Sequence, residues 1–99
     1  MAPRVELDYD RLSNFCRRNH IVRLSFFGSV LRDDFGPGSD ADMLAEFDPG
    51  AVVTLLDMAR MEIELAEMIG RTVDLRTPAE LSRYFRDDVV ANAEVQYAA

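Results

Sequence analysis

One stretch decides the fold: residues 27–44, from Phe27 to Leu44, with the sequence FGSVLRDDFGPGSDADML. The apolar and aromatic run over 21–27 that leads into it predicts a central strand. A Gly-Ser turn, a short helix over 30–32 and a Gly/Pro loop over 33–39 are expected next, before a second strand over about 40–47. The rest of the chain is therefore expected to pack around two neighbouring strands joined by this loop.

The second strand opens with two aspartates, Asp40 and Asp42. Side chains alternate along a strand, so both carboxylates should lie on one face, about 7 Å apart. Two like charges in this arrangement repel each other unless a cation lies between them. Carboxylate oxygens suit a hard cation, and Mg²⁺ is the one we expect.

The Gly-Ser turn supplies the complementary half of a site. Gly28 lacks a Cβ and leads into a helix N-terminus, so backbone N–H groups at Gly28 and Ser29 can face an anion such as phosphate. Arg32 is close enough in sequence to pair with a phosphate, although it could equally form a salt bridge with Asp33 or Asp34. Together with the two aspartates, this pattern predicts a site for a nucleoside triphosphate.

These motifs resemble a known signature. Gly28-Ser29, ten intervening residues and Asp40-Ala41-Asp42 are similar to the signature of the polymerase-beta-like nucleotidyltransferase superfamily. The chain length and the run over 39–47 resemble its smallest branch, the minimal nucleotidyltransferases. That branch has a third carboxylate on a later strand, and Asp74, between Val73 and Leu75, matches it. The resemblance covers residues from about 12 to 97.

The resemblance implies a function and a set of site residues. Asp40 and Asp42 would bind two Mg²⁺ ions, and Asp74 would complete the ion nearer the nucleophile. Gly28 and Ser29 would hold the β- and γ-phosphates of ATP. The nucleotide-binding set also includes the two residues Arg32 and Ser39. An enzyme of this type transfers AMP to an acceptor hydroxyl, and pyrophosphate leaves.

The branch also implies a partner. Its members pair with HEPN-domain proteins, small helical ribonucleases, in toxin–antitoxin systems, and some transfer AMP to a tyrosine of that partner. A non-catalytic antitoxin that neutralises its partner by contact is the alternative, and a small-molecule (aminoglycoside-like) adenylyltransferase is a weaker one. The sequence contains no second domain to bind base and acceptor, so a partner chain or a homodimer must help to form those pockets.

Composition sets outer limits on these functions. The 99 residues should form one domain over 1–99, with 1–9 as a loose lead-in. The net charge of −7 argues against direct nucleic-acid binding, and all eleven basic residues are arginines. Neither a signal peptide nor an apolar run of about 20 residues is present, so no membrane contact is expected. The lone Cys16, which we expect in the core, is consistent with a reducing cytoplasm.

The remaining elements complete an α/β (α+β) fold. A helix over 10–19 capped by Asp8 or Asp10, a helix over 54–69 stopped by Gly70, and a strand over 72–76 are expected. A capping box at residues 77–80 predicts a further helix, and another is expected from residue 86 to about 95, with Tyr97 packing near its end. We therefore predict a three- to four-stranded mixed sheet with helices mainly on one face, the polymerase-beta-like palm core.

One residue is inconsistent with its helix. Glu62 lies within the apolar arc of the helix over 54–69. A buried carboxylate needs a partner, and an arginine is the obvious one. Alternatively, Glu62 lies at the edge of the buried face and reaches solvent.

Overall fold

The computed structural model describes residues 7–28 and 40–99. In that part of the chain the elements are, in order, α1 (Tyr9–Arg18), β1 (Ile21–Phe27), β2 (Ala41–Phe47), α2 (Leu55–Ile69), β3 (Val73–Arg76), the 3-10 helix η2 (Pro78–Glu80), α3 (Arg86–Asn92) and β4 (Glu94–Ala98). The helix expected over 30–32 and the loop over 33–39 lie outside the described residues.

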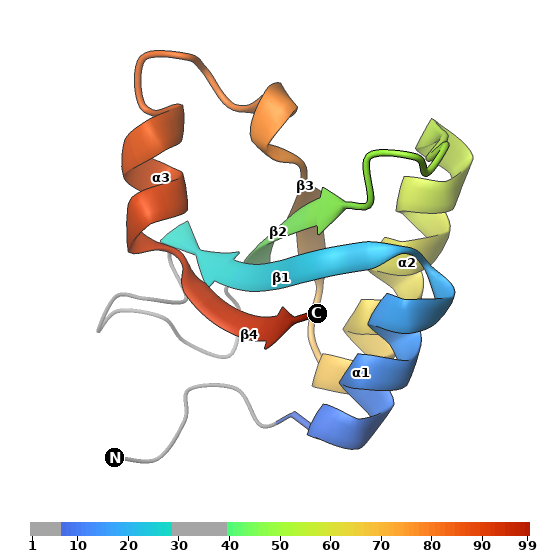
Figure 1. Ribbon diagram of the computed structural model, residues 1–99. Coiled ribbons are helices and arrows are strands. Elements are labelled where there is room, and N and C mark those ends of the chain that lie inside the picture. The colour runs from blue at the N-terminus through green and yellow to red at the C-terminus, as the bar shows by residue number, and fades with distance from the viewer. Residues whose placement is uncertain (1–6, 29–39) are drawn as a thin grey trace.

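The four strands form one mixed sheet with the order β3-β2-β1-β4. The central strand β1 is antiparallel to both β2 and β4, whereas β2 and β3 are parallel. Helices α1 and α2 lie together beside the sheet, and α3 stands apart from them (Figure 1). The predicted fold class is confirmed, with four strands in the sheet.

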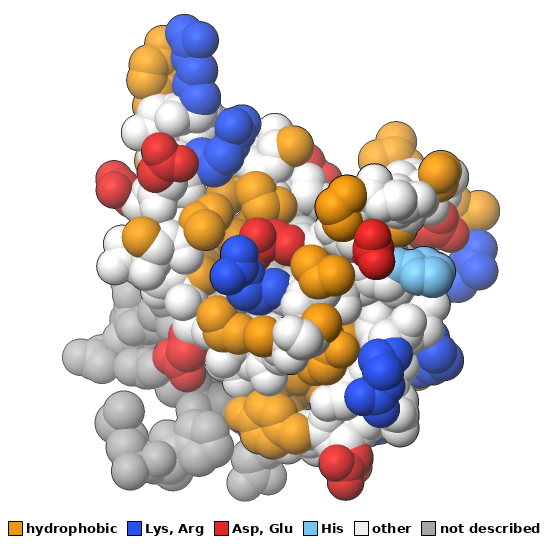
Figure 2. All heavy atoms as spheres, in the orientation of Figure 1, with side chains coloured by type: hydrophobic (Ala, Val, Ile, Leu, Met, Phe, Trp, Pro, Cys, Tyr) orange, Lys and Arg blue, Asp and Glu red, His pale blue; other side chains and the backbone are white. Residues whose placement is uncertain are grey.

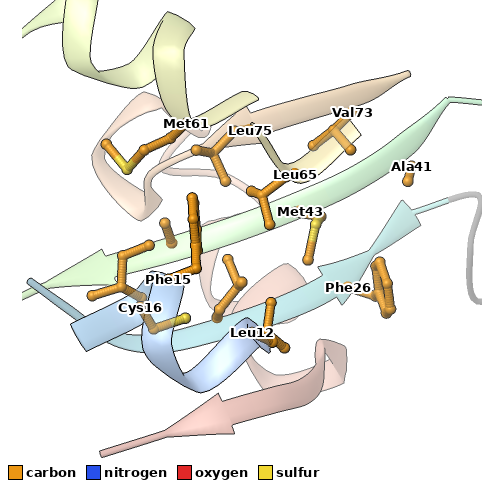
Figure 3. Packing of buried hydrophobic residues seen from close by; sticks show 13 residues of the cluster. Leu12, Phe15, Cys16, Phe26, Ala41, Met43, Met61, Leu65, Val73 and Leu75 are labelled. Atoms are coloured by element: carbon orange, nitrogen blue, oxygen red, sulfur yellow. The ribbon is translucent and has the colours of Figure 1, made fainter. Parts of the chain in front are cut away.

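The core lies between the sheet and these two helices. Strand β2 alternates as predicted: Ala41, Met43 and Ala45 are buried in the core, so Asp42 lies on the opposite face. In Figure 3, Met43 lies among core residues of both helices, which include Leu12 of α1 and Leu65 of α2. The core cluster consists of Leu12, Phe15, Cys16, Ile21, Leu24, Phe26, Ala41, Met43, Ala45, Met61, Leu65, Val73 and Leu75. The face that carries Asp42 is therefore not part of this core.

The long helices begin and end close to the predicted residues. Asp8 caps α1 by accepting a hydrogen bond from the backbone N–H of Arg11. A capping box between Thr54 and Asp57 begins α2, and Gly70, with φ 83°, ends it. Hydrogen bonds from Thr54 lower the pKa of Asp57. None of the helices in the described ranges combines the length and apolarity that a membrane crossing requires.

Cys16 is fully buried in the core, as predicted. Burial disfavours the charged thiolate and raises the pKa of the thiol to about 12. The side chain therefore packs as a small apolar group.

A helix begins at Pro78 as predicted, but the predicted capping box at residues 77–80 does not form. Only the three-residue 3-10 helix η2 forms there, and Thr77 makes no side-chain cap hydrogen bond. The backbone is extended again at Leu81. Arg86 binds the turn from outside, because its guanidinium donates to the carbonyl oxygens of Leu81 at 3.0 Å and Ala79 at 3.5 Å. A tertiary contact thus satisfies carbonyl groups that a longer helix would have paired.

The C-terminal helix is also shorter than predicted. It ends at Asn92, and the residues that follow form β4 along the free edge of β1. A ladder with β1 satisfies backbone groups of a central strand that would otherwise be an open edge. Tyr97 contacts the core from this strand, which confirms its packing role.

Among the residues that the structure describes, Glu62 is bound by a backbone N–H group and not by an arginine. Its Oε2 accepts a hydrogen bond from the backbone N–H of Leu75 at 2.8 Å, in a partly buried position. Leu75 belongs to β3, an edge strand, and its N–H points away from β2. Glu62 therefore attaches α2 to the outer edge of the sheet and satisfies a donor that no strand pairs.

We predict that Glu62→Ala lowers the free energy of unfolding by about 1–3 kcal/mol, because the N–H of Leu75 loses a charged acceptor. The control is Glu64→Ala on the same helix, which removes an exposed ion pair with Arg18 (3.1 Å) and should cost under about 1 kcal/mol. Urea denaturation measures both. Equal losses in the two variants would show that the Leu75 contact contributes nothing.

Candidate functional site

Two of the three predicted carboxylates lie side by side in the sheet. Asp42 of β2 and Asp74 of β3 are partners in the parallel ladder. Ladder partners share a face and belong to strands about 4.8 Å apart. Residues 32 positions apart in the sequence are therefore brought together by backbone pairing alone.

Gly28 lies directly against one of these carboxylates. It follows β1 with φ 68°, a conformation that glycine adopts without strain. A Cβ at this position would lie 2.7 Å from Oδ2 of Asp42. Only a residue without a side chain lets the backbone approach the carboxylate so closely. The predicted proximity of Gly28 to Asp42 is thus built into the fold.

Asp40, the third predicted carboxylate, immediately precedes β2 and is exposed. The neighbouring residue Ala41 donates a backbone hydrogen bond of 2.8 Å to Thr72, which fixes the start of β2 against the start of β3. The structure thus places Asp40 at the same end of the sheet as Asp42 and Asp74. Three other predicted site residues, Ser29, Arg32 and Ser39, lie outside the described residues.

Asp74 forms an ion pair that the sequence reasoning missed. Nε of Arg76 donates to its Oδ1 at 2.9 Å, and Nη2 donates to its Oδ2 at 3.2 Å. The hydrogen bond to Asp74 raises the pKa of Arg76. Because side chains alternate along a strand, the spacing of two residues was a usable signal for this pair.

The donor atoms suit a hard divalent cation, but the side chains are not assembled around one. Asp42 and Asp74 offer carboxylate oxygens from adjacent positions on one face, the ligand type that Mg²⁺ prefers. Within residues 7–28 and 40–99, no three His, Cys, Asp or Glu side chains converge closely enough to hold a metal. For a shared metal centre to form, Asp74 would have to exchange Arg76 for the ion.

A pocket of about 320 Å³ lies beside Asp74, and we refer to it as the Asp74 pocket. It lies between the first half of α2, strand β3 and η2. Its apolar lining consists of Leu55, Met58, Ala59 and Leu75, and its charged lining consists of Glu62, Asp74, Arg76 and Glu80. No sequence motif pointed to this pocket, because its walls come from three separate segments.

The sequence matches the family model described as "Nucleotidyltransferase domain" over residues 10–96. The chain belongs to this family. The prediction of an enzyme of the nucleotidyltransferase type, acting on a nucleotide, is confirmed by this match. The roles of individual residues in the site remain predictions.

A curated relative supports the same placement. A protein of Methanocaldococcus jannaschii, named as a candidate protein adenylyltransferase, is 34% identical over 76 residues, which cover 77% of this chain and 80% of the relative. A solved structure described as a candidate minimal nucleotidyltransferase is also 34% identical. It has a TM-score of 0.70 and covers 86% of this chain and 85% of that one.

More distant structures share the fold. A chain of a toxin–antitoxin crystal structure with AMP-PNP has a TM-score of 0.73 at 18% identity and covers 94% of this chain and 75% of that one. A chain from a complex of a tri-AMPylated HEPN toxin of Shewanella oneidensis with its MNT antitoxin has a TM-score of 0.64 at 17% identity, covering 92% and 70%. The resemblance to minimal nucleotidyltransferases is confirmed.

We predict that Gly28→Ala destabilises the protein more than Gly70→Ala does. Both glycines have positive φ, so both variants incur about 1–2 kcal/mol of backbone strain. Only at Gly28 does the new Cβ meet a side chain, since nothing lies within 4 Å of the corresponding position at Gly70. The displacement of Asp42 should add about 1–3 kcal/mol, measured by urea denaturation.

The double variant Gly28→Ala with Asp42→Ala provides the control. If the contact between Gly28 and Asp42 is responsible, removing the carboxylate should bring the cost of Gly28→Ala down to that of Gly70→Ala. A cost that stays unchanged without Asp42 would contradict the assignment.

Proposed function

We propose that this chain transfers AMP from ATP to a hydroxyl of a partner protein, a tyrosine, and acts as antitoxin to a HEPN ribonuclease toxin. One observation carries the proposal: Asp42 and Asp74 are paired in register on one face, with Gly28 against Asp42. This arrangement occurs in a chain of the nucleotidyltransferase family. The name of the M. jannaschii relative and the toxin–antitoxin complexes among the structural neighbours support the acceptor and the partner.

The reaction has a simple balance. The acceptor oxygen bonds to the α-phosphorus of ATP, and the bond from that phosphorus to the bridging oxygen of the β-phosphate breaks. Pyrophosphate leaves with the bonding electron pair, and the hydroxyl proton passes to a base. Asp74 is the carboxylate on the side of the open pocket, so it is the group we assign to the acceptor side of the site.

The predicted site residues would bind the metal ions and the triphosphate. Asp40, Asp42 and Asp74 would hold two Mg²⁺ ions, which, when bound, neutralise charge on the triphosphate and make the acceptor hydroxyl more acidic. Gly28 has no side chain, so its backbone can approach phosphate oxygens. Ser29, the next residue, would bind the phosphates with it. Arg32 and Ser39 complete the proposed nucleotide-binding set. Asp74 must leave Arg76 to take part.

We predict that Mg²⁺ raises the melting temperature, and that Mg²⁺ with ATP raises it further, since ligands that bind only the native state stabilise it by mass action. Asp40→Asn with Asp42→Asn should remove this shift. The matched control is Asp87→Asn with Asp88→Asn, which removes the same charge from the first turn of α3 and should leave the shift unchanged. An equal shift in all three proteins would contradict the assignment of Asp40 and Asp42 as ligands.

We predict that the protein, mixed with its HEPN partner and Mg²⁺-ATP, adds the mass of AMP to that partner, as read by intact-mass spectrometry. Asp74→Asn should still bind ATP through the other site residues, but it should transfer AMP about 10²-fold more slowly, because the acceptor hydroxyl is no longer activated. Arg23→Gln, which breaks the Arg23–Glu46 pair on the same face of the sheet, is the control and should leave the rate unchanged.

Two results would overturn this proposal. If the wild-type protein silences its partner without adding AMP, the chain neutralises the toxin by contact alone. If Asp74→Asn transfers AMP as fast as the wild type, Asp74 does not act on the acceptor.

A further inference from the structure

The Asp74 pocket joins the proposed reaction centre to an exposed apolar surface. Leu55, at the first position of α2, lines the pocket and is 87% exposed. Beside it in the sequence, Leu56 is 68% exposed and Val52 is 88% exposed. Apolar side chains gather at the protruding start of α2, at the upper right of Figure 2. Together Val52, Leu55 and Leu56 form what we call the α2 patch. Exposed apolar side chains that gather at one place on the surface are candidates for contact with another macromolecule.

The charges around the pocket favour a cationic partner. Three of its lining residues are carboxylates, Glu62, Asp74 and Glu80, against the single guanidinium of Arg76. Arg76 is paired with Asp74, so these two charges compensate each other, and the excess negative charge of the lining comes from Glu62 and Glu80. The whole chain carries a net charge of −7, which adds to the same negative field. Complementarity therefore points to a segment with basic residues.

We propose that the Asp74 pocket is the acceptor site: it receives the phenol side chain of a basic segment of the acceptor protein, whose surface docks on the α2 patch. This inference rests on the proposed function, because it names where the acceptor of that reaction binds. The apolar wall contributed by Leu55, Met58 and Ala59 would cover the ring, and the thioether of Met58 suits contact with an aromatic edge.

The geometry of the pocket directs the hydroxyl. The first turns of α2 contribute three apolar side chains and, further along, Glu62, whereas the carboxylate of Asp74 and the guanidinium of Arg76 come from β3. A phenol has the same division, with an apolar ring and one polar end. A ring placed against Leu55, Met58 and Ala59 would direct its hydroxyl toward the polar groups of β3. Glu80 can pair with a basic residue beside the acceptor, and Glu62 adds negative charge there while it keeps its hydrogen bond to Leu75.

Addition of a strand to β3 is disfavoured as the binding mode. Such a partner would need the outward backbone groups of β3, but the N–H of Leu75 is already bound by Glu62 at 2.8 Å. Side-chain insertion leaves that hydrogen bond intact. The structure therefore favours recognition of one side chain and its flanking charges over main-chain pairing.

The inference can be tested on the isolated chain by NMR. The peptide acetyl-Arg-Tyr-Arg-amide is titrated into ¹⁵N-labelled protein, and the backbone amides of Ala59, Leu75 and Glu80 should shift. The charge-reversed peptide acetyl-Glu-Tyr-Glu-amide should bind at least about five-fold more weakly, since its charges are repelled by the carboxylates of the pocket. Shifts confined to residues outside the pocket, or none at millimolar peptide, would overturn the proposal.

Ala59→Phe fills the pocket from an exposed helix position and should abolish the peptide shifts. The control is Ala91→Phe on α3, also at an exposed position, which should bind the peptide like the wild type. Circular dichroism establishes that both variants are folded. If Ala59→Phe is folded and still binds the peptide with unchanged affinity, the pocket is not the binding site.

AMP transfer to the HEPN partner separates this inference from the proposed function. If Asp74→Asn loses transfer while Ala59→Phe transfers normally, the function stands and the acceptor site lies elsewhere. If the wild type transfers no AMP, the proposed function fails, and the peptide titration still decides whether the pocket binds a phenol. Concentration-dependent broadening at Val52, Leu55 and Leu56 without peptide would overturn the docking assignment in favour of a second copy of this chain.

Discussion

The parallel pairing of β2 with β3 is the constraint on which the site depends. It places Asp42 beside Asp74, although β3 contributes only four residues to the ladder. So short an edge strand makes few hydrogen bonds of its own. Two further hydrogen bonds help to hold it in place. Ala41 donates to Thr72 where the strands begin, and Glu62 accepts from Leu75 on the outer edge. Helix α2 thus fixes the position of an aspartate that it does not itself carry.

Local sequence signals predicted those elements whose boundaries are set locally. Thr54 and Gly70 mark the ends of α2, and the alternation in β2 correctly assigned Asp42 to the face opposite the core. Each of these features is determined by neighbouring residues. The pairing of Asp74 with Asp42 was accessible only through the family resemblance, since no local rule gives the register of strands that lie far apart in sequence.

The predictions failed where contacts between separate elements decide the structure. Residues 94–98 form a strand because β1 offers an unpaired edge, and the short helix η2 is followed by an extended backbone whose carbonyls are bound by Arg86. An arginine was expected as the partner of Glu62, because sequence patterns reveal charged side chains but not unpaired backbone N–H groups such as that of Leu75. The Asp74 pocket was not predicted either, because its walls come from three separate elements, α2, β3 and η2.

The two paired aspartates differ in how firmly they are held. The backbone at Gly28 lies against the Asp42 carboxylate, and backbone atoms cannot move aside without shifting the end of β1. Asp74 is held by Arg76 in an ion pair whose side chains are 39% and 48% exposed. Exposed pairs contribute about 0–1 kcal/mol, so Asp74 can exchange Arg76 for another partner at little cost. In the proposed reaction, this difference suits Asp42 to a fixed role at the nucleotide and Asp74 to an adjustable role at the acceptor. The proposed acceptor surface adjoins Asp74, so the contact that would silence a partner protein would also present its hydroxyl. Neutralisation by contact and by AMP transfer would then be successive steps at one surface.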